Sequence, residues 1–136
     1  MAGYSGTPLV QKIGLKPGHR LALAGEPDGF LRELDPLPEG VTIATGGRAT
    51  LDCVILFADE ARTLQSLIIR WKARLAPAGM LWVAWPKKAS KVVTDVTEAL
   101  VMDIGLGAGL VDVKVCAVNE VWSGLKFVRR VRDRAT

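Results

Sequence analysis

Histidine and cysteine are scarce in this chain of 136 residues, which contains one histidine and two cysteines. His19 stands in the turn-forming sequence KPGHR, whereas Cys53 and Cys116 stand in the apolar runs LDCVILF and VKVCAV. A zinc site needs at least three protein ligands, usually histidine or cysteine, and a reduced cysteine in an apolar run behaves as a small buried hydrophobic residue. We therefore expect no metal site, and we expect His19 to be a surface turn residue.

Long hydrophobic runs are also missing from the chain. The apolar stretches are broken by charged residues or proline before they reach the roughly 18 to 20 residues that cross a bilayer. Residues 1–7 lack the basic and then apolar order of a signal peptide. Hydrophobic residues nevertheless make up 49% of the chain, which is enough to build a core on both faces of a sheet. The sequence therefore predicts a single soluble domain over residues 1–136, located in the cytoplasm.

Positive charge is sparse outside the carboxyl terminus. The net charge is +4, and four arginines less one aspartate in residues 129–134 supply +3 of it, which leaves +1 for residues 1–128. A nucleic-acid surface usually spreads lysine and arginine along one face of the body, because affinity grows with the number of phosphates neutralised. We therefore expect residues 132–136 to form a solvated basic tail, and we do not expect nucleic acid as a partner.

Short apolar runs alternate with amphipathic segments along the chain, which is the pattern of an α/β sheet. An amino-terminal arm, residues 1–19, should contain a short helix that Thr7 caps and Gly14 closes. The sheet should occupy residues 20–131, with a brief helix near residues 30–34. The expected strands are residues 20–24, 41–45, 51–57, 80–85, 113–118 and 125–131, and the last two should form an antiparallel hairpin.

Two longer helices are expected between these strands. The first has apolar residues at helical spacing behind an acidic first turn at residues 59–60; they are Leu64, Leu67, Ile68, Trp71 and Leu75. In the second helix, which should reach about residue 106, Asp95 and Glu98 have the spacing of a capping box. Asp52, at the start of a buried strand, is better explained as an acceptor for a backbone amide or an arginine than as a catalytic acid.

The order of these elements resembles that of class I S-adenosylmethionine-dependent methyltransferases with one helix and one strand missing. Four phrases carry the resemblance: LKPGHRLALAG at the family's first strand, LDCVILFA at its fourth, LAPAGMLWVAW at its fifth, and GLVDVKVCAVNEVWSGLKFVRR at its closing hairpin. The whole chain, with GYSGTPLVQKIG and WPKKAS, is also similar to a family of short bacterial proteins of unknown function. The resemblance implies a three-layer Rossmann-like sheet, mostly parallel, with strand order 2-1-3-4-6-5 and a C-terminal antiparallel hairpin.

The residues that align with the family's cofactor loop, D-x-G-x-G-x-G, match it only in part. Gly25 and Gly29 match the first and third glycines, but Leu23 replaces the acid and Pro27 replaces the middle glycine. A proline fixes φ and removes an amide that could donate to a ligand. The end of the second strand, residues 45–47, offers no acid for the ribose hydroxyls that the family binds there.

Two acidic residues weaken a nucleotide interpretation of the same loop. Glu26 and Asp28 precede the next helix, where they would repel the phosphates that a helix amino terminus usually attracts. We therefore expect no cofactor, and we interpret Gly25, Glu26, Asp28 and Gly29 as a degenerate cofactor loop.

A different ligand site is suggested by WPKKAS, residues 85–90. In parallel α/β sheets ligands gather outside the carboxyl ends of the strands, and this segment follows such an end. A pocket here would have Trp85 and Trp122 as walls; its polar groups would come from Lys87, Lys88, Ser90 and Glu120. A partly desolvated lysine favours a small carboxylate or phosphate as the ligand. The structural alternative is that both tryptophans seal the core while the lysines extend into water.

These observations favour a noncatalytic binding or regulatory domain on a degenerate methyltransferase-like scaffold, and they leave open whether the protein is an enzyme. One alternative is an enzyme that acts on a small anion through Lys87 or Lys88. Others are a surviving S-adenosylmethionine-dependent methyltransferase and, with least support, a nucleic-acid adaptor that uses the arginine tail. The expected partners are a small anionic ligand or a protein, and the exposed edge at residues 41–45 predicts a weak homodimer.

Overall fold

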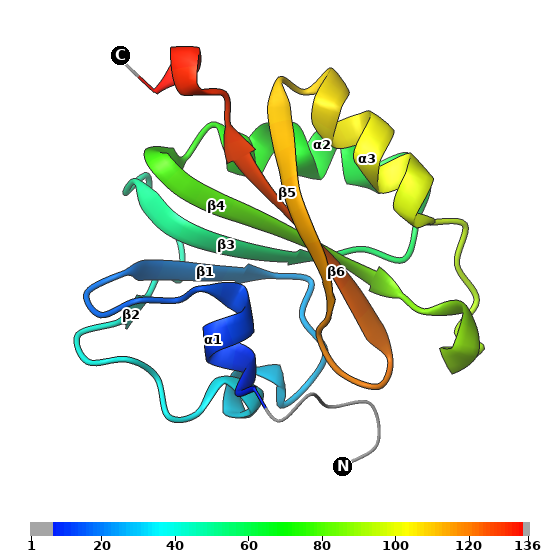
Figure 1. Ribbon diagram of the computed structural model, residues 1–136, viewed down its shortest axis with the longest axis horizontal. Helices are drawn as coiled ribbons and strands as arrows, with labels where there is room; N and C mark the ends of the chain where they lie inside the picture. Colours follow the sequence, from blue (N-terminus) through cyan, green and yellow to red (C-terminus); the bar gives the residue numbers. More distant parts are fainter. Residues whose placement is uncertain (1–6, 135–136) are drawn as a thin grey trace.

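A computed structural model describes residues 7–134, and within them the chain forms one mixed sheet (Figure 1). Its six strands are β1 (Arg20–Ala24), β2 (Thr42–Ile43), β3 (Leu51–Phe57), β4 (Leu75–Pro86), β5 (Leu110–Ala117) and β6 (Trp122–Arg129). The strand order is β2-β1-β3-β4-β6-β5, which confirms the predicted order. The pairs among β2, β1, β3 and β4 are parallel, and β6 lies antiparallel to both β4 and β5.

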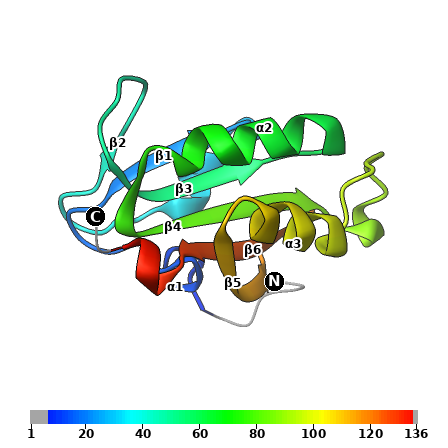
Figure 2. The same ribbon diagram turned by 90° about the horizontal axis from the view of Figure 1, so that it is seen from above.

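Helices cover the two faces of this sheet. The helices α2 (Ala61–Lys72) and α3 (Glu98–Gly107) pack on one face through Leu64, Ile68 and Val101. The other face is covered by α1 (Leu9–Ile13) and by the 3-10 helix η1 (Phe30–Leu34). Figure 2 shows α2 and α1 on opposite sides of the strands. The predicted three-layer architecture is therefore confirmed.

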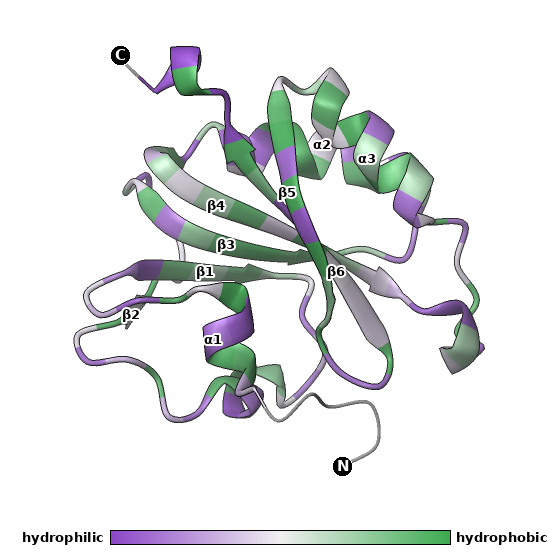
Figure 3. Cartoon of the chain, in the orientation of Figure 1, coloured by the Kyte–Doolittle hydropathy of each residue, from purple (hydrophilic) through white to green (hydrophobic). Residues whose placement is uncertain are grey.

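The central strands are buried because both faces of the sheet are covered. In β3, Val54 and Leu56 contact the layer of α2 and α3, whereas Cys53, Ile55 and Phe57 face the layer of α1 and η1. This alternation follows from the pleat, which turns successive side chains to opposite faces. Apolar residues accordingly occupy most of β3 and β4 (Figure 3). The continuous apolar run LDCVILF is thus a strand that is covered on both sides, as predicted.

Several predicted boundaries need correction. The fourth strand begins at Leu75, before the predicted residue 80, and an irregularity in its pairing with β3 places residues 76–79 opposite Asp52. The second strand contains only Thr42–Ile43 of the predicted residues 41–45, and it lies at the edge of the sheet. The last strand begins at Trp122 and ends at Arg129, and a 3-10 helix, Val131–Asp133, takes the place of its predicted end.

The helix caps also differ from those predicted. Thr97, not Asp95, is the N-cap of α3, and its hydroxyl accepts from the Leu100 amide at 3.2 Å. Asp95 instead caps α2, because its Oδ1 accepts from the Ala61 amide at 2.7 Å. Local spacing cannot reveal this cap, because the two residues are brought together only by folding.

The amino-terminal arm contains its predicted helix, but Pro8 occupies the N-cap, with no side-chain cap from Thr7. Gly14 closes the helix in the left-handed conformation, as expected. Residues 1–6 of the predicted arm and residues 135–136 of the predicted tail lie outside the described part of the chain.

Candidate ligand site at the carboxyl ends of the strands

The loop after β1 turns sharply against the end of β3. Gly25 has φ +70°, and a Cβ atom added there would lie 2.6 Å from the carbonyl oxygen of Phe57. No side chain fits at that distance, so the backbone of this loop touches the neighbouring strand directly. Gly29, with φ +80°, then sets the direction of η1. Both glycines that match the family's loop therefore have a structural explanation within this chain.

Three aromatic rings fill the space beside this loop. Phe30, the first residue of η1, meets Phe57 edge to face with ring centroids 4.7 Å apart. Phe57 meets Trp122 in the same manner at 5.0 Å. Edge-to-face pairs at these separations are favourable contacts, and Phe30 is fully buried. The carboxyl ends of β1 and β3 are thus sealed by side chains on the face that α1 and η1 cover.

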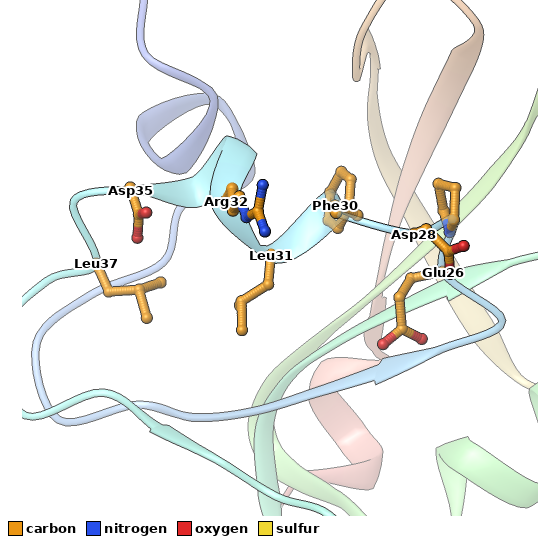
Figure 4. A pocket seen from close by; sticks show the side chains of 9 residues that line it. Glu26, Asp28, Phe30, Leu31, Arg32, Asp35 and Leu37 are labelled. Carbon is orange, nitrogen blue, oxygen red and sulfur yellow. The ribbon is translucent and has the colours of Figure 1, made fainter.

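A groove of about 440 Å³ runs along the outside of η1 (Figure 4). Its charged lining groups are the carboxylates of Glu26, Asp28 and Asp35 and the guanidinium of Arg32. Figure 4 shows Glu26 and Asp28 at one end of the groove and Asp35 with Leu37 at the other. The degenerate loop therefore borders a predominantly acidic groove whose charged side chains are exposed to solvent.

The two tryptophans of the predicted pocket point to opposite faces of the sheet. Trp85 pairs with Ser123 in the register of β4 and β6 and belongs to the core under α2 and α3. Trp122 pairs with Pro86 and packs against the core on the other face. Successive pairs in an antiparallel ladder alternate between faces, so these side chains cannot be walls of one pocket. The single pocket expected from the sequence is instead divided into two grooves.

The first groove, which we call the Trp85 groove, has a volume of about 280 Å³. It is lined by Trp85, Pro86, Lys87, Lys88, Thr94, Val96, Thr97, Glu98 and Ser123. The backbone amide of Lys87 continues the ladder by donating to the Val121 carbonyl at 2.7 Å, which fixes where its side chain starts. Both lysines therefore border one cavity, together with the acidic residue Glu98.

Ser90 has a local role instead of lining that groove. Its hydroxyl donates to the Lys87 carbonyl at 2.6 Å and accepts from the Val92 amide at 3.3 Å. These bonds hold the turn after β4, so the Ser90 hydroxyl is already engaged with the backbone.

The second groove, the Trp122 groove, has a volume of about 350 Å³ and is acidic. Asp28, Glu33 and Glu120 contribute its carboxyl groups. The Asn119 side chain donates to Glu33 Oε1 at 3.0 Å, and its own oxygen accepts from the Val121 and Trp122 amides at 2.9 Å. Asn119 thus ties the hairpin turn to η1, a contact that the sequence did not predict because it joins positions far apart in the chain.

Within residues 7–134, histidine, cysteine and acidic side chains form no group of three or more that could hold a metal ion. None of the helices in the same residues is long and apolar enough to span a membrane.

The chain resembles solved structures, although no family model and no curated protein matches its sequence. A possible exported protein from Bordetella parapertussis superposes with a TM-score of 0.63 at 14% identity, over 89% of this chain and 65% of that one. An S-adenosylmethionine-dependent methyltransferase from Aquifex aeolicus gives a TM-score of 0.58 at 15% identity, over 88% and 86% of the two chains. Magnesium protoporphyrin IX methyltransferase from Synechocystis PCC 6803, with bound S-adenosylmethionine, gives 0.61 at 15% identity, over 90% and 74%.

These likenesses extend over most of the chain, but their low identities carry information about the fold alone. The chain spans less than two thirds of the length of the Bordetella protein. The strand order, the antiparallel β6 and these neighbours together show that the chain has the Rossmann-like fold of the class I S-adenosylmethionine-dependent methyltransferases.

Proposed function

We propose that this protein is a noncatalytic binding domain built on a shortened methyltransferase-like scaffold. The observation that carries the proposal is the sealing of the loop region by Phe30, Phe57 and Trp122. A cofactor site normally encloses most of its ligand in a preformed cavity. Here the space next to the loop holds the buried rings of Phe30 and Phe57, and the two grooves that border the loop are open and acidic.

The loop itself supports the same conclusion. Pro27 offers no amide where the family's middle glycine would present one, and the Gly25 backbone is already packed against the Phe57 carbonyl. The loop after β2 has threonine and glycine where the family has an acid for the ribose. A ligand with the size and polarity of S-adenosylmethionine would find few donors here and would stay largely exposed to water.

Titration calorimetry tests this proposal. We expect neither S-adenosylmethionine nor S-adenosylhomocysteine to give a saturable heat with the purified protein, whereas an active methyltransferase measured alongside gives one. Saturable binding that is weakened by Asp28→Ala, a change at an exposed groove residue, would overturn the proposal. That result would favour the alternative, a surviving methyltransferase. Transfer of a labelled methyl group from the cofactor would then establish the activity.

For the ligand, we propose a small carboxylate or phosphate bound in the Trp85 groove. The supporting observation is that Lys87 and Lys88 border this cavity together with Thr94, Thr97 and Ser123. Glu98 lies in the same lining, and its negative charge leaves the groove with a net charge of about +1. A ligand with a single negative charge therefore suits this groove best. An enzyme acting on such an anion is the second candidate, because the Ser123 hydroxyl of the groove could also contact a reacting group.

Self-association and location complete the proposal. The short strand β2 ends the sheet, so its outer backbone groups are free of a further strand. We propose weak homodimerisation through this edge, as well as a cytoplasmic location and kinship with the family of short bacterial proteins. Sedimentation equilibrium that gives a strict monomer at high concentration would rule out the dimer.

A further inference from the structure

Four lysines gather on the sheet face that carries α1, away from both grooves at the strand ends. Lys126 of β6 pairs with Trp82 of β4 on one side and with Lys114 of β5 on the other, so all three side chains project from the same face. Lys12 belongs to α1, and Lys16 follows that helix. We call Lys12, Lys16, Lys114 and Lys126 the lysine cluster. Figure 3 shows hydrophilic positions on both α1 and β5, the two elements that border it.

Trp82 holds the parts of this cluster together. Its indole Nε1 donates to the Ile13 carbonyl at 2.9 Å, which fixes the end of α1 on β4. The Lys114 ammonium lies over the Trp82 ring, 6.0 Å from its centroid. The Lys126 ammonium reaches α1, since it lies 3.9 Å from the position that a Cβ atom on Gly14 would occupy. The cluster therefore lies around a buried and anchored tryptophan, with Lys12 and Lys126 partly buried and Lys16 and Lys114 exposed.

None of the four lysines lies within ion-pair distance of an aspartate or glutamate in residues 7–134. Asp112, on the neighbouring strand, pairs with Phe127 and therefore points to the opposite face. Partial burial, and next the nearby Lys114, lower the pKa of Lys126; Cys53 opposes this shift, and Lys16 adds a smaller lowering. Lys12 and Lys114 also face Cys116. The cluster thus holds repelling positive charges that a bound anion would relieve.

We propose that the lysine cluster binds a compact polyanion, a small ligand that carries two or more phosphate groups. Each ammonium is a compact charge with three donors, which suits phosphate oxygens approached from several directions. A ligand with several negative charges can contact more than one ammonium at once, and a partly desolvated lysine forms stronger charge-assisted bonds than a solvated one. A long nucleic acid suits the surface less well, because residues 1–128 carry a net charge of only +1.

This inference goes beyond the proposed function and does not depend on it. The lysine cluster lies on β5, β6 and α1, whereas the Trp85 groove and the loop after β1 lie at the strand ends. Each site can therefore be abolished without changing a residue of the other, and failure of one proposal leaves the other standing.

Titration calorimetry at fixed ionic strength tests the inference, with orthophosphate, pyrophosphate and tripolyphosphate as probes. We expect affinity to rise with the number of phosphate groups. Lys114→Gln and Lys126→Gln should each weaken tripolyphosphate binding by about tenfold or more, whereas Lys126→Arg should retain it. The matched control is Lys91→Gln, which removes one charge from an exposed lysine that lines neither groove and should leave this affinity within about twofold.

The folded state of each variant is checked by its Tm. Lys126→Gln removes a repelled charge, so it should not lower the Tm, and loss of binding then reports the site itself. Equal weakening by Lys91→Gln would overturn the proposal, because it would indicate only general charge attraction. Tighter binding of a single-stranded oligonucleotide than of tripolyphosphate, lost in the same variants, would also overturn it in favour of a nucleic-acid surface.

Discussion

Two glycines of α3 should respond in opposite ways to the same substitution. Gly105 faces β6, and a Cβ atom added there would lie 2.2 Å from both Cε1 and Cζ of Phe127. The Phe127 ring is fully buried, so it has no free space into which to move. Gly107, two residues further along the helix, has no atom within 4 Å of the added Cβ position. Neither residue has a positive φ, so packing alone should distinguish them.

The expected magnitudes follow from two opposing effects. Replacing glycine by alanine within a helix stabilises it by about 0.5 to 1 kcal/mol. Gly107→Ala should realise part of this gain, reduced because the residue ends the helix. At Gly105 the same gain is opposed by overpacking, which costs roughly 1 to 3 kcal/mol and lies at the upper end for a contact this short. Gly105→Ala should therefore lower the free energy of unfolding by about 2 kcal/mol.

Urea unfolding followed by circular dichroism measures both changes. A double variant, Gly105→Ala with Phe127→Leu, gives the added methyl group more space than Gly105→Ala alone. The double variant should therefore lose less stability than the sum of the two single losses. If Gly105→Ala proved as stable as Gly107→Ala, α3 would not pack on β6 as described here.

Three further predictions concern other parts of the chain. Burial raises the pKa of the Cys53 thiol from 9.0 to about 12, so the thiol ionises first in the unfolded chain. The free energy of unfolding is therefore unaffected well below pH 9 and should fall above it, by about 1 kcal/mol at pH 10. Urea titrations at pH 7 and pH 10 should show this loss of unfolding free energy in the native protein but not in Cys53→Ala. An equal loss in the two proteins would contradict the prediction. Asp95→Ala removes the acceptor for the Ala61 amide and should lower the free energy of unfolding by about 1 kcal/mol, whereas Asp95→Asn, which keeps an oxygen there, should lose less in thermal melts. Lys87→Ala and Lys88→Ala should each leave the Tm nearly unchanged, and one of them should weaken binding of acetate or phosphate in the Trp85 groove by about tenfold; unchanged affinity in both would refute that site.

The parts of the fold that depend on local pattern were predictable from the sequence. The apolar run of β3 and the helical spacing of Leu64 and Ile68 in α2 lie where periodicity indicated. Asp52 also behaves as expected, because its Oδ2 accepts from the Arg20 amide at 2.8 Å. The strand and the helix follow from the spacing of neighbouring residues. The Asp52 contact depends on the pairing of β1 with β3, which the methyltransferase resemblance implied.

The candidate site was less predictable because it depends on register. Whether Trp85 and Trp122 share a face is decided by the pairing of β4 with β6, and a shift of one residue would move one of them to the other side. The lysine cluster was not predicted for a similar reason. Lys12 and Lys126 stand at opposite ends of the sequence, and only the packing of α1 against β4 and β6 brings them together.

The segment between η2 (Lys88–Ser90) and α3 links two parts of the molecule mechanically. Thr94 donates to the Asp59 carbonyl at 2.7 Å and Asp95 accepts from the Ala61 amide, so this segment holds the start of α2. Thr94 and Thr97 also form one wall of the Trp85 groove. A ligand that pulls this wall inward or pushes it outward would therefore tighten or release the first turn of α2. The rate of hydrogen exchange at the Ala61 amide should then report occupancy of a groove that this amide does not line.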